Sequence, residues 1–187
     1  MIEISEIDIK EFENTIYERY TKLFLDEEQR EWSKITNTYN QGLEKFYKIV
    51  LDNSIIGFFM LEKNKKDYPY YLDYFAIFEE YQNKGYGTKA IKKLLLEIIG
   101  NNGLCIEIEK EDNDEPITIK RAKFYKKLGF KRIDSEYLLY SVLYTPYVYN
   151  YNCEKETIDK IMFDYYKMNC GEDEMKINCK IVNKINK

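Results

Sequence analysis

The sequence contains no histidine among its 187 residues and only three prolines and one tryptophan. The missing histidine removes the commonest general base from any mechanism. The four cysteines, Cys105, Cys153, Cys170 and Cys179, lack the spacing of a metal motif. We therefore expect no metal centre, and we interpret the cysteines as reduced thiols of a cytoplasmic protein, with a disulfide among the last three as the less favoured alternative.

Long apolar runs are absent as well, and none reaches the length of a membrane span. The N-terminus lacks the basic start and apolar centre of a signal peptide. The net charge of −4 argues against a nucleic-acid surface. The chain length suits one domain with its own core. We expect a cytoplasmic protein, monomeric or homodimeric, that binds neither membrane nor nucleic acid.

The most informative stretch runs from Tyr71 to Glu97. It starts as an aromatic and apolar strand that ends at about Phe78. A polar loop, 82–87, follows, and an amphipathic helix opens between Gly85 and Thr88. First-turn amides of a helix have no intrahelical partners, and glycines let the backbone approach a ligand closely. The stretch therefore predicts a cradle for a phosphate-bearing cofactor.

Three kinds of glycine loop compete for this stretch. A Walker loop requires Gly-Lys-Ser/Thr, whereas here the order is Gly87-Thr88-Lys89, which excludes that motif. A dinucleotide fingerprint fits Gly85-x-Gly87-x-x-Ala90, but six residues separate the strand from its first glycine. The third kind is Gln82-x-x-Gly85-x-Gly87 placed after a strand that can offer its own backbone groups to a ligand.

This third pattern resembles the acyl-CoA motif of the GNAT superfamily of N-acetyltransferases. A second segment is similar to another mark of that family, Ala122-Lys123-Phe124-Tyr125-Lys126-Lys127-Leu128-Gly129-Phe130. The resemblance covers roughly residues 44–145. It implies an α/β (α+β) fold with a mixed, mostly antiparallel twisted sheet, helices on both faces, and a central parallel strand pair splayed for acyl-CoA.

The resemblance also implies where the cofactor is held. The backbone of Phe75, Ala76, Ile77 and Phe78 is expected to bind the pantetheine arm and to polarise the acyl carbonyl. The pyrophosphate is expected at the loop and helix start, formed by Gln82, Asn83, Lys84, Gly85, Tyr86, Gly87 and Thr88. Tyr125 matches the family tyrosine that contacts the thiol and often protonates it as it leaves, a role that suits a phenol with a pKa near 10.

The general base is less well defined by the resemblance. Many family members carry a carboxylate where this sequence has Tyr71, so Asp73, two residues later, is one candidate. Glu107 and Glu109 alternate with Ile106 and Ile108 on the next predicted strand, and they are rival candidates. A second departure is Ile119, which stands where the family often has an asparagine.

The rest of the chain predicts further helices and strands. Ile2–Ile7 alternates as a strand, and helices follow from Ile9 and after Asp26. The second helix carries Trp32 and Tyr39, which are core residues by the simplest interpretation and substrate-binding candidates by resemblance. Further predicted elements are strands at 45–51, 55–63 and 104–109, a helix at 116–128, and a hairpin pairing 130–133 with 137–144.

We expect a GNAT-like domain over residues 1–146. Residues 147–187 are expected to form an extension, with a helix at about 154–168 and a strand within 175–185, packed on that domain or at a subunit interface.

The predicted function is acetyl-CoA-dependent N-acetylation of a small-molecule or peptide amine by direct attack on the thioester. The alternatives are an acyl-CoA-binding regulator without turnover and a dinucleotide-binding oxidoreductase.

Overall fold

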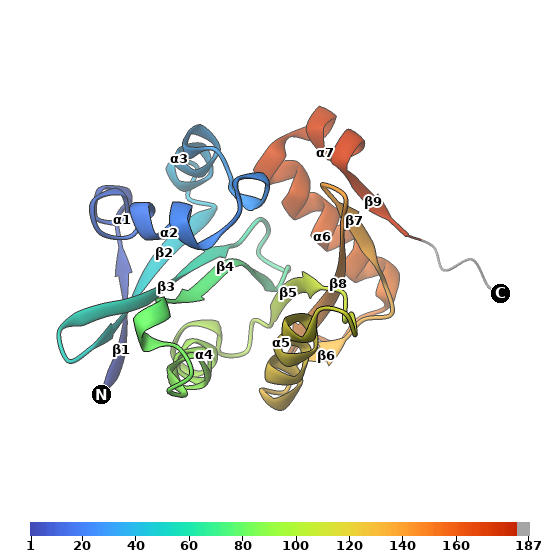
Figure 1. Cartoon of the computed structure of the whole chain (residues 1–187). Helices are drawn as coiled ribbons and strands as arrows, with labels where there is room; N and C mark the ends of the chain where they lie inside the picture. Colours follow the sequence, from blue (N-terminus) through green and yellow to red (C-terminus); the bar gives the residue numbers. More distant parts are fainter. Residues whose placement is uncertain (183–187) are drawn as a thin grey trace. The chain divides into compact units, whose positions relative to one another are not determined.

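The computed structural model describes residues 1–182, except for the side chain of Glu27, and the chain divides into two units (Figure 1). The first unit comprises residues 1–63 and 70–100. The second comprises residues 64–69 and the chain from residue 101 onward. Each unit contributes its own strands and helices.

The sheet of the first unit has four antiparallel strands in chain order: β1 (Ile2–Ile7), β2 (Glu44–Leu51), β3 (Ser54–Glu62) and β4 (Tyr70–Ile77). Asp52 and Asn53 join β2 to β3 with φ angles of 49° and 69°. Positive φ at both residues gives the backbone twist that suits a tight hairpin. The strands predicted for this region are confirmed to within one residue at most ends.

Helices cover both faces of this sheet (Figure 1). Three lie on one face: α1 (Ile9–Thr15), α2 (Tyr17–Leu23) and α3 (Trp32–Asn40). On the other face, α4 (Tyr86–Leu94) continues as a π-helical turn, Leu95–Ile99. The helix predicted from Ile9 is divided at Ile16, which leaves helical geometry with φ −122°. This break keeps Phe12, Ile16 and Tyr20 fully buried in one core cluster.

A β-bulge interrupts the pairing of β3 with β4. Met60 pairs with Tyr74 and Leu61 pairs with Leu72, so Asp73 is an extra residue in β4. A bulge bends its strand and redirects side chains. As a result Asp73 and Tyr74, although adjacent in sequence, both contact residues from the side of the sheet that carries α1 to α3.

The sheet of the second unit is antiparallel, in the order β5 (Leu104–Glu109), β8 (Val142–Tyr149), β7 (Tyr137–Leu139) and β9 (Cys179–Ile181). A short strand, β6 (Lys131–Arg132), also pairs with β8. The predicted hairpin of 130–133 with 137–144 is therefore wrong. Tyr140 and Ser141 adopt positive φ, so the tight turn falls between β7 and β8 instead.

Up to residue 182, this unit contains three helices: α5 (Pro116–Lys127), α6 (Lys155–Cys170) and α7 (Glu172–Asn178). Pro116 starts α5, as predicted. The strand predicted within 175–185 is partly wrong, because Met175–Asn178 is helical and β9 covers 179–181. Three acidic residues in the first turn of α7 favour that helix through its dipole. Residues 183–185 of that prediction lie outside the described residues.

Within residues 1–182, none of the helices combines the length and the apolar character needed to cross a bilayer.

Candidate functional site

The loop after β4 is held by its own polar side chains. A 3₁₀ turn, Glu79–Tyr81, follows the strand, and Gln82 Nε2 donates to the Ile77 carbonyl at 2.8 Å. Lys84 Nζ donates to the Glu80 carbonyl at 2.7 Å. Asn83 has φ 59°. These contacts give the predicted cofactor loop a defined shape without any bound ligand.

The first turn of α4 is open at its N-terminal end. Gly85 is the N-cap residue, with φ 76° in the left-handed region, and no side chain caps the helix. A Cβ atom added to Gly85 would meet nothing within 4 Å. The hydrogen bond from Lys89 N–H to Gly85 O is 3.3 Å long, so the amides of Tyr86, Gly87 and Thr88 precede the helical ladder. Such amides at the positive end of the helix dipole can bind a phosphate group.

The end of β4 leads directly into this loop. Phe75 stacks on Phe59 with ring centroids 4.8 Å apart, and the Phe78 N–H donates to Ile56 O at 2.8 Å. Ala76 and Ile77 pair with β3 residues, Phe58 and Gly57. The predicted splaying concerns β4 and β5, which belong to different units, so it stays a prediction.

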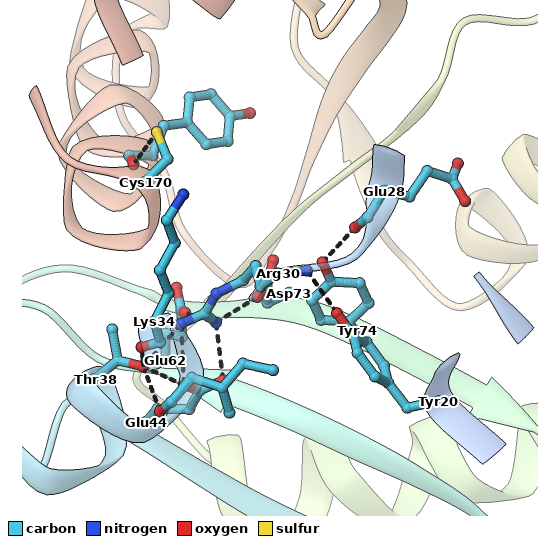
Figure 2. Close-up of polar contacts among 12 residues, drawn as sticks. Tyr20, Glu28, Arg30, Lys34, Thr38, Glu44, Glu62, Asp73, Tyr74 and Cys170 are labelled. Atoms are coloured by element: carbon cyan, nitrogen blue, oxygen red, sulfur yellow. Dashed lines mark hydrogen bonds and ion pairs between the residues drawn. The ribbon is translucent and has the colours of Figure 1, made fainter. Parts of the chain in front are cut away.

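A buried charge cluster lies at the opposite end of the same strands (Figure 2). Arg30, from the segment between α2 and α3, places Nη1 2.9 Å from Glu44 Oε1, 2.7 Å from Glu62 Oε1 and 2.8 Å from Asp73 Oδ2. Its Nη2 donates to Thr38 Oγ1 at 2.8 Å. Thr38 in turn contacts the Glu44 carboxylate. One guanidinium therefore joins strands β2, β3 and β4 to helix α3.

The cluster holds three carboxylates and one guanidinium, and burial favours the protonated form of two of these carboxylates, Glu44 and Asp73. Loss of hydration raises the pKa of Glu44 to about 7, against the opposing effect of Arg30. Burial likewise raises the pKa of Asp73, with Arg30 again opposing. Oxygens of the three carboxylates lie within 4.8 Å of one another, a spacing at which a metal ion could bind. Here the Arg30 guanidinium supplies the positive charge.

Two tyrosines fasten the segment that carries Arg30. The Arg30 backbone N–H donates to the Tyr20 hydroxyl at 2.7 Å, and the Tyr74 hydroxyl donates to the Glu28 carbonyl at 2.5 Å (Figure 2). The two rings also meet edge to face, with centroids 4.9 Å apart. The segment between α2 and α3 is thus attached to the sheet through both its backbone and the Arg30 side chain.

The predicted substrate-binding aromatics pack against the core of this unit. Trp32 lies parallel to Phe12 with centroids 6.4 Å apart, and its centroid is 4.6 Å from that of Tyr17. Tyr39 stacks on Phe46 at 5.3 Å. Both side chains are partly buried, so each has one face for packing and some surface left for a ligand.

The remaining predicted catalytic residues lie in the second unit. Tyr125 on α5 is buried, and burial raises the pKa of its phenol to about 12. The positive charge of Arg121 lowers this pKa, and the negative charge of Glu107 raises it. Arg121, one turn before Tyr125, forms an ion pair with Glu109 at 3.0 Å. Glu107 and Glu109 on β5 are half-buried. The structure therefore brings Tyr125, Glu107 and Glu109 into one neighbourhood through Arg121.

Sequence reasoning missed both arginines and two of the carboxylates. Glu44 begins β2 and Glu62 ends the largely apolar strand β3, and the two pair with each other across β2 and β3. That position was an available signal, because a buried carboxylate requires a cationic partner. The identity of the partner, Arg30, could not be read from spacing, since it comes from an irregular segment.

The comparisons with known proteins agree with this geometry. Residues 42–132 match the family model described as an acetyltransferase (GNAT) domain. No curated protein matches the sequence significantly. A structure from Bacteroides thetaiotaomicron, described as a GNAT-family acetyltransferase, has a TM-score of 0.78 at 20% identity and covers 91% of this chain and 99% of its own.

Two further solved structures are similar over a smaller part of the chain. A GNAT-family acetyltransferase from Elizabethkingia anophelis with acetyl-CoA bound has a TM-score of 0.59 at 17% identity, over 79% of this chain and 96% of its own. The ribosomal-protein-S18-alanine N-acetyltransferase from Escherichia coli has a TM-score of 0.58 at 18% identity, over 79% of this chain and 92% of its own. The predicted fold class is confirmed by these similarities.

Proposed function

We propose that this chain, of which residues 42–132 match an acetyltransferase (GNAT) domain, transfers the acetyl group of acetyl-CoA to an amine by direct attack on the thioester. The observation that carries this proposal is the open first turn of α4. Gly85 in left-handed geometry turns the amides of Tyr86, Gly87 and Thr88 outward, where they can bind the pyrophosphate of coenzyme A. Lys84 and Gln82 belong to the same loop.

The reaction sets three tasks. The acyl carbonyl has to be held, the amine has to lose a proton, and the thiolate has to gain one as it leaves. In this proposal the backbone of Phe75 to Phe78 binds the pantetheine arm, and the thioester carbonyl is polarised by amides of this segment that β3 does not engage, which excludes the Phe78 N–H donated to Ile56 O. The amine attacks the carbonyl carbon, and the carbon–sulfur bond breaks with the electron pair leaving on sulfur. Tyr125 then gives its proton to the thiolate. A pKa of about 12 keeps the phenol protonated at neutral pH, and it also makes the phenol a weaker proton donor than an ordinary tyrosine with a pKa near 10.

Among the candidate bases, Glu109 is favoured over Asp73. Only 9% of the Asp73 side chain is accessible, and its carboxylate is paired with Arg30. Glu109 is more exposed, with 24% of its side chain accessible, so a proton that it accepts can pass to water. Glu107, two residues earlier on β5, can assist through a water molecule.

The acceptor that we propose is a small-molecule or peptide amine, with Trp32 and Tyr39 contributing to its site. Both rings stack on core residues and stay only partly buried, and we assign the acceptor contact to their exposed parts. We further propose a cytoplasmic enzyme, monomeric or homodimeric, with 147–187 as an extension of the catalytic domain. The reaction as written uses no metal ion.

The test measures thiol release from acetyl-CoA with a panel of small amines and N-terminal peptides, together with acetyl-CoA binding by calorimetry. Acetyl-CoA binding and amine-dependent thiol release are expected. Gly85→Val is expected to weaken acetyl-CoA binding by about tenfold or more, because a β-branched residue opposes positive φ. Gly42→Val, at φ 72° in the turn before β2, is the matched control and should leave binding unchanged.

Two alternatives predict different results in the thiol-release and binding measurements, and in thermal-shift assays with coenzyme A and NAD. A regulator would bind acetyl-CoA without turnover on any amine, and the Tyr71 and Ile119 departures from the family pattern favour this second candidate. An oxidoreductase would be stabilised by NAD and not by coenzyme A. Stabilisation by neither cofactor would overturn the proposal and both alternatives.

A further inference from the structure

Arg19 of α2 reaches the turn that follows β4. Its Nη2 lies 2.9 Å from Glu80 Oε1 and its Nη1 lies 3.2 Å from Glu80 Oε2, so the contact is bidentate. The central carbon of the guanidinium also lies over the Phe78 ring, 4.9 Å from its centroid. Both partners belong to the first unit. One side chain therefore contacts the 3₁₀ turn, Glu79–Tyr81, at its N-cap residue and at its centre.

Helix α2 is itself firmly attached to the core of this unit. Tyr20, the neighbour of Arg19, is fully buried, and its ring packs on that of Tyr74. Its hydroxyl accepts a hydrogen bond from the Arg30 backbone N–H at 2.7 Å (Figure 2). Arg19 therefore projects from a helix whose position is set by close packing, and it can serve as a fixed support for a neighbouring loop.

The hydrogen bonds inside the cofactor loop, by contrast, are local. The bond from Gln82 to the Ile77 carbonyl spans five residues, and the bond from Lys84 to the Glu80 carbonyl spans four. The Arg19–Glu80 pair spans 61 residues. Lys84 binds the backbone of Glu80 while Arg19 binds its side chain, so the two cations hold the same residue. The pair thus connects the cofactor loop to α2, an element far from it in the sequence.

The geometry of this pair is better than that of an ordinary surface ion pair. Exposed pairs contribute little, because water screens them and two flexible side chains have to be ordered. Here the planar guanidinium matches both carboxylate oxygens and also contacts an aromatic ring. Arg19 and Glu80 keep 49% and 46% of their side chains accessible. We therefore expect an effect of a few-fold on a binding constant and a small effect on global stability.

We propose that Arg19 is a positioning residue for the cofactor, which acts through Glu80 to hold the cofactor loop in the conformation that binds the pyrophosphate of acetyl-CoA. This inference rests on the proposed function, since it takes acetyl-CoA as the ligand of the loop. A helix on one face of the sheet thereby fixes the loop that leads to α4 on the opposite face (Figure 1). Without the pair the loop samples other conformations, and the apparent affinity falls with the population that remains competent to bind.

A direct attraction between the Arg19 charge and the cofactor phosphates predicts a different pattern. Arg19→Met removes a positive charge, whereas Glu80→Met removes a negative one. If Arg19 acts through Glu80, each substitution weakens acetyl-CoA binding by about fivefold, and the double variant binds no more weakly than either single variant. If Arg19 acts on the phosphates by its charge, Glu80→Met strengthens binding instead.

The experiment combines two measurements on the full chain. Calorimetry gives the Kd for acetyl-CoA, and hydrogen exchange without cofactor follows peptides that cover residues 79–89. We expect faster exchange in both methionine variants, because the amides of Tyr81 and Gln82 are hydrogen-bonded within the turn that Arg19 holds. Thermal unfolding checks that each variant is folded.

Two further variants serve as controls. Arg19→Lys keeps the charge without the bidentate contact, so its Kd should lie between those of wild type and Arg19→Met. Lys22→Met breaks the other ion pair of α2, with Glu18, and should change neither the Kd nor the exchange. Unchanged or tighter acetyl-CoA binding by Glu80→Met would overturn the proposal, as would unchanged exchange in the loop peptides. Failure of the wild type to bind acetyl-CoA would overturn the proposed function as well, whereas the other two outcomes leave that function standing.

Discussion

Arg30 Nη1 lies 2.8 Å from Asp73 Oδ2, and this ion pair connects an irregular segment to the bulge of β4. The same nitrogen contacts Glu44 and Glu62, so one guanidinium faces three carboxylates. Because the Arg30 side chain is 9% exposed, water screens these contacts weakly. The cluster therefore links local stability to pH.

Removal of this cation should be costly. Arg30→Met leaves buried carboxylates without their partner, so we expect the free energy of unfolding to fall by about 3–5 kcal/mol. Urea denaturation measures this loss. The loss should shrink towards pH 5, where the carboxyl groups take up protons. Lys22→Ala, which breaks the exposed pair with Glu18, is the control. A similar small effect for both variants would show that the cluster contributes little.

Glu44 should make stability depend on pH in an unusual direction. Burial raises the pKa of Glu44 to about 7, while an unfolded chain titrates near 4.3. The folded state binds more protons between these values, so this contribution to stability is complete at low pH and is lost as the pH rises through 7. Relative to Glu44→Gln, the wild type should lose roughly 2–3 kcal/mol between pH 5 and pH 8.

Denaturation curves at several pH values measure this difference. The control is Glu18→Gln, because the pKa of Glu18 is lowered by Lys22, and its pH dependence should have the opposite sign. If wild type and Glu44→Gln show parallel pH profiles, Glu44 does not hold a proton in the folded state.

Tyr125→Phe should separate chemistry from binding. If the phenol is the acid for the leaving thiolate, kcat should drop by about a hundredfold while the Kd for acetyl-CoA changes less than about threefold. Steady-state kinetics and calorimetry measure the two quantities. Tyr147→Phe, at another buried tyrosine of the second unit, is the control and should keep kcat. An equal loss in kcat and affinity would remove the acid role.

The candidate bases can be distinguished by a paired substitution. Glu109→Gln should lower kcat by about a hundredfold or more with little change in stability, because the residue is partly exposed. Asp73→Asn should retain turnover within about threefold, because the proposed reaction does not use the Arg30 cluster. The reverse pattern would assign the base to Asp73.

Arg121→Gln should shift the pH dependence of kcat, since it removes the guanidinium that faces Glu109 and Tyr125.

Gly57 should not tolerate a side chain. A Cβ atom at this position would lie 2.2 Å from the Ala76 carbonyl oxygen, a backbone atom of the strand before the cofactor loop. We expect Gly57→Ala to lower stability by about 3 kcal/mol or more through overpacking. Gly42→Ala provides the comparison, because its Cβ meets nothing and its cost of about 1 kcal/mol comes from positive φ alone. Equal losses in thermal unfolding would mean that β3 and β4 adjust to the added methyl.

The regular elements could be predicted because their signals are local. The alternation in Ile2–Ile7, Pro116 at a helix start and Gly85 before α4 each act within a few residues. The break at Ile16 and the bulge at Asp73 could not be predicted, since both depend on packing against other elements. The hairpin was misassigned because Tyr140 and Ser141 adopt positive φ without the Asn-Gly pair that usually marks such a turn.

The candidate site also has one part that could be predicted from the sequence and one part that could not. The glycine loop was identified because its chemistry lies in one continuous stretch of sequence. Arg30 and Arg121 act on partners 43 residues and 12 residues away in the chain, and nothing in their own neighbourhood marks them. Their roles follow from the contacts, which place each guanidinium beside a predicted catalytic carboxylate.

The extra residue in β4 has a consequence for redesign of this protein. With strict alternation, an acidic group and its aromatic neighbour would project to opposite sides, and either could be exchanged independently. Here they share one side, so moving the acid along the strand means deleting a residue. Such a deletion would reverse the orientation of every side chain between the excision and the nearer end of the strand. Register, more than side-chain identity, is the variable that a designer of new specificities would have to control.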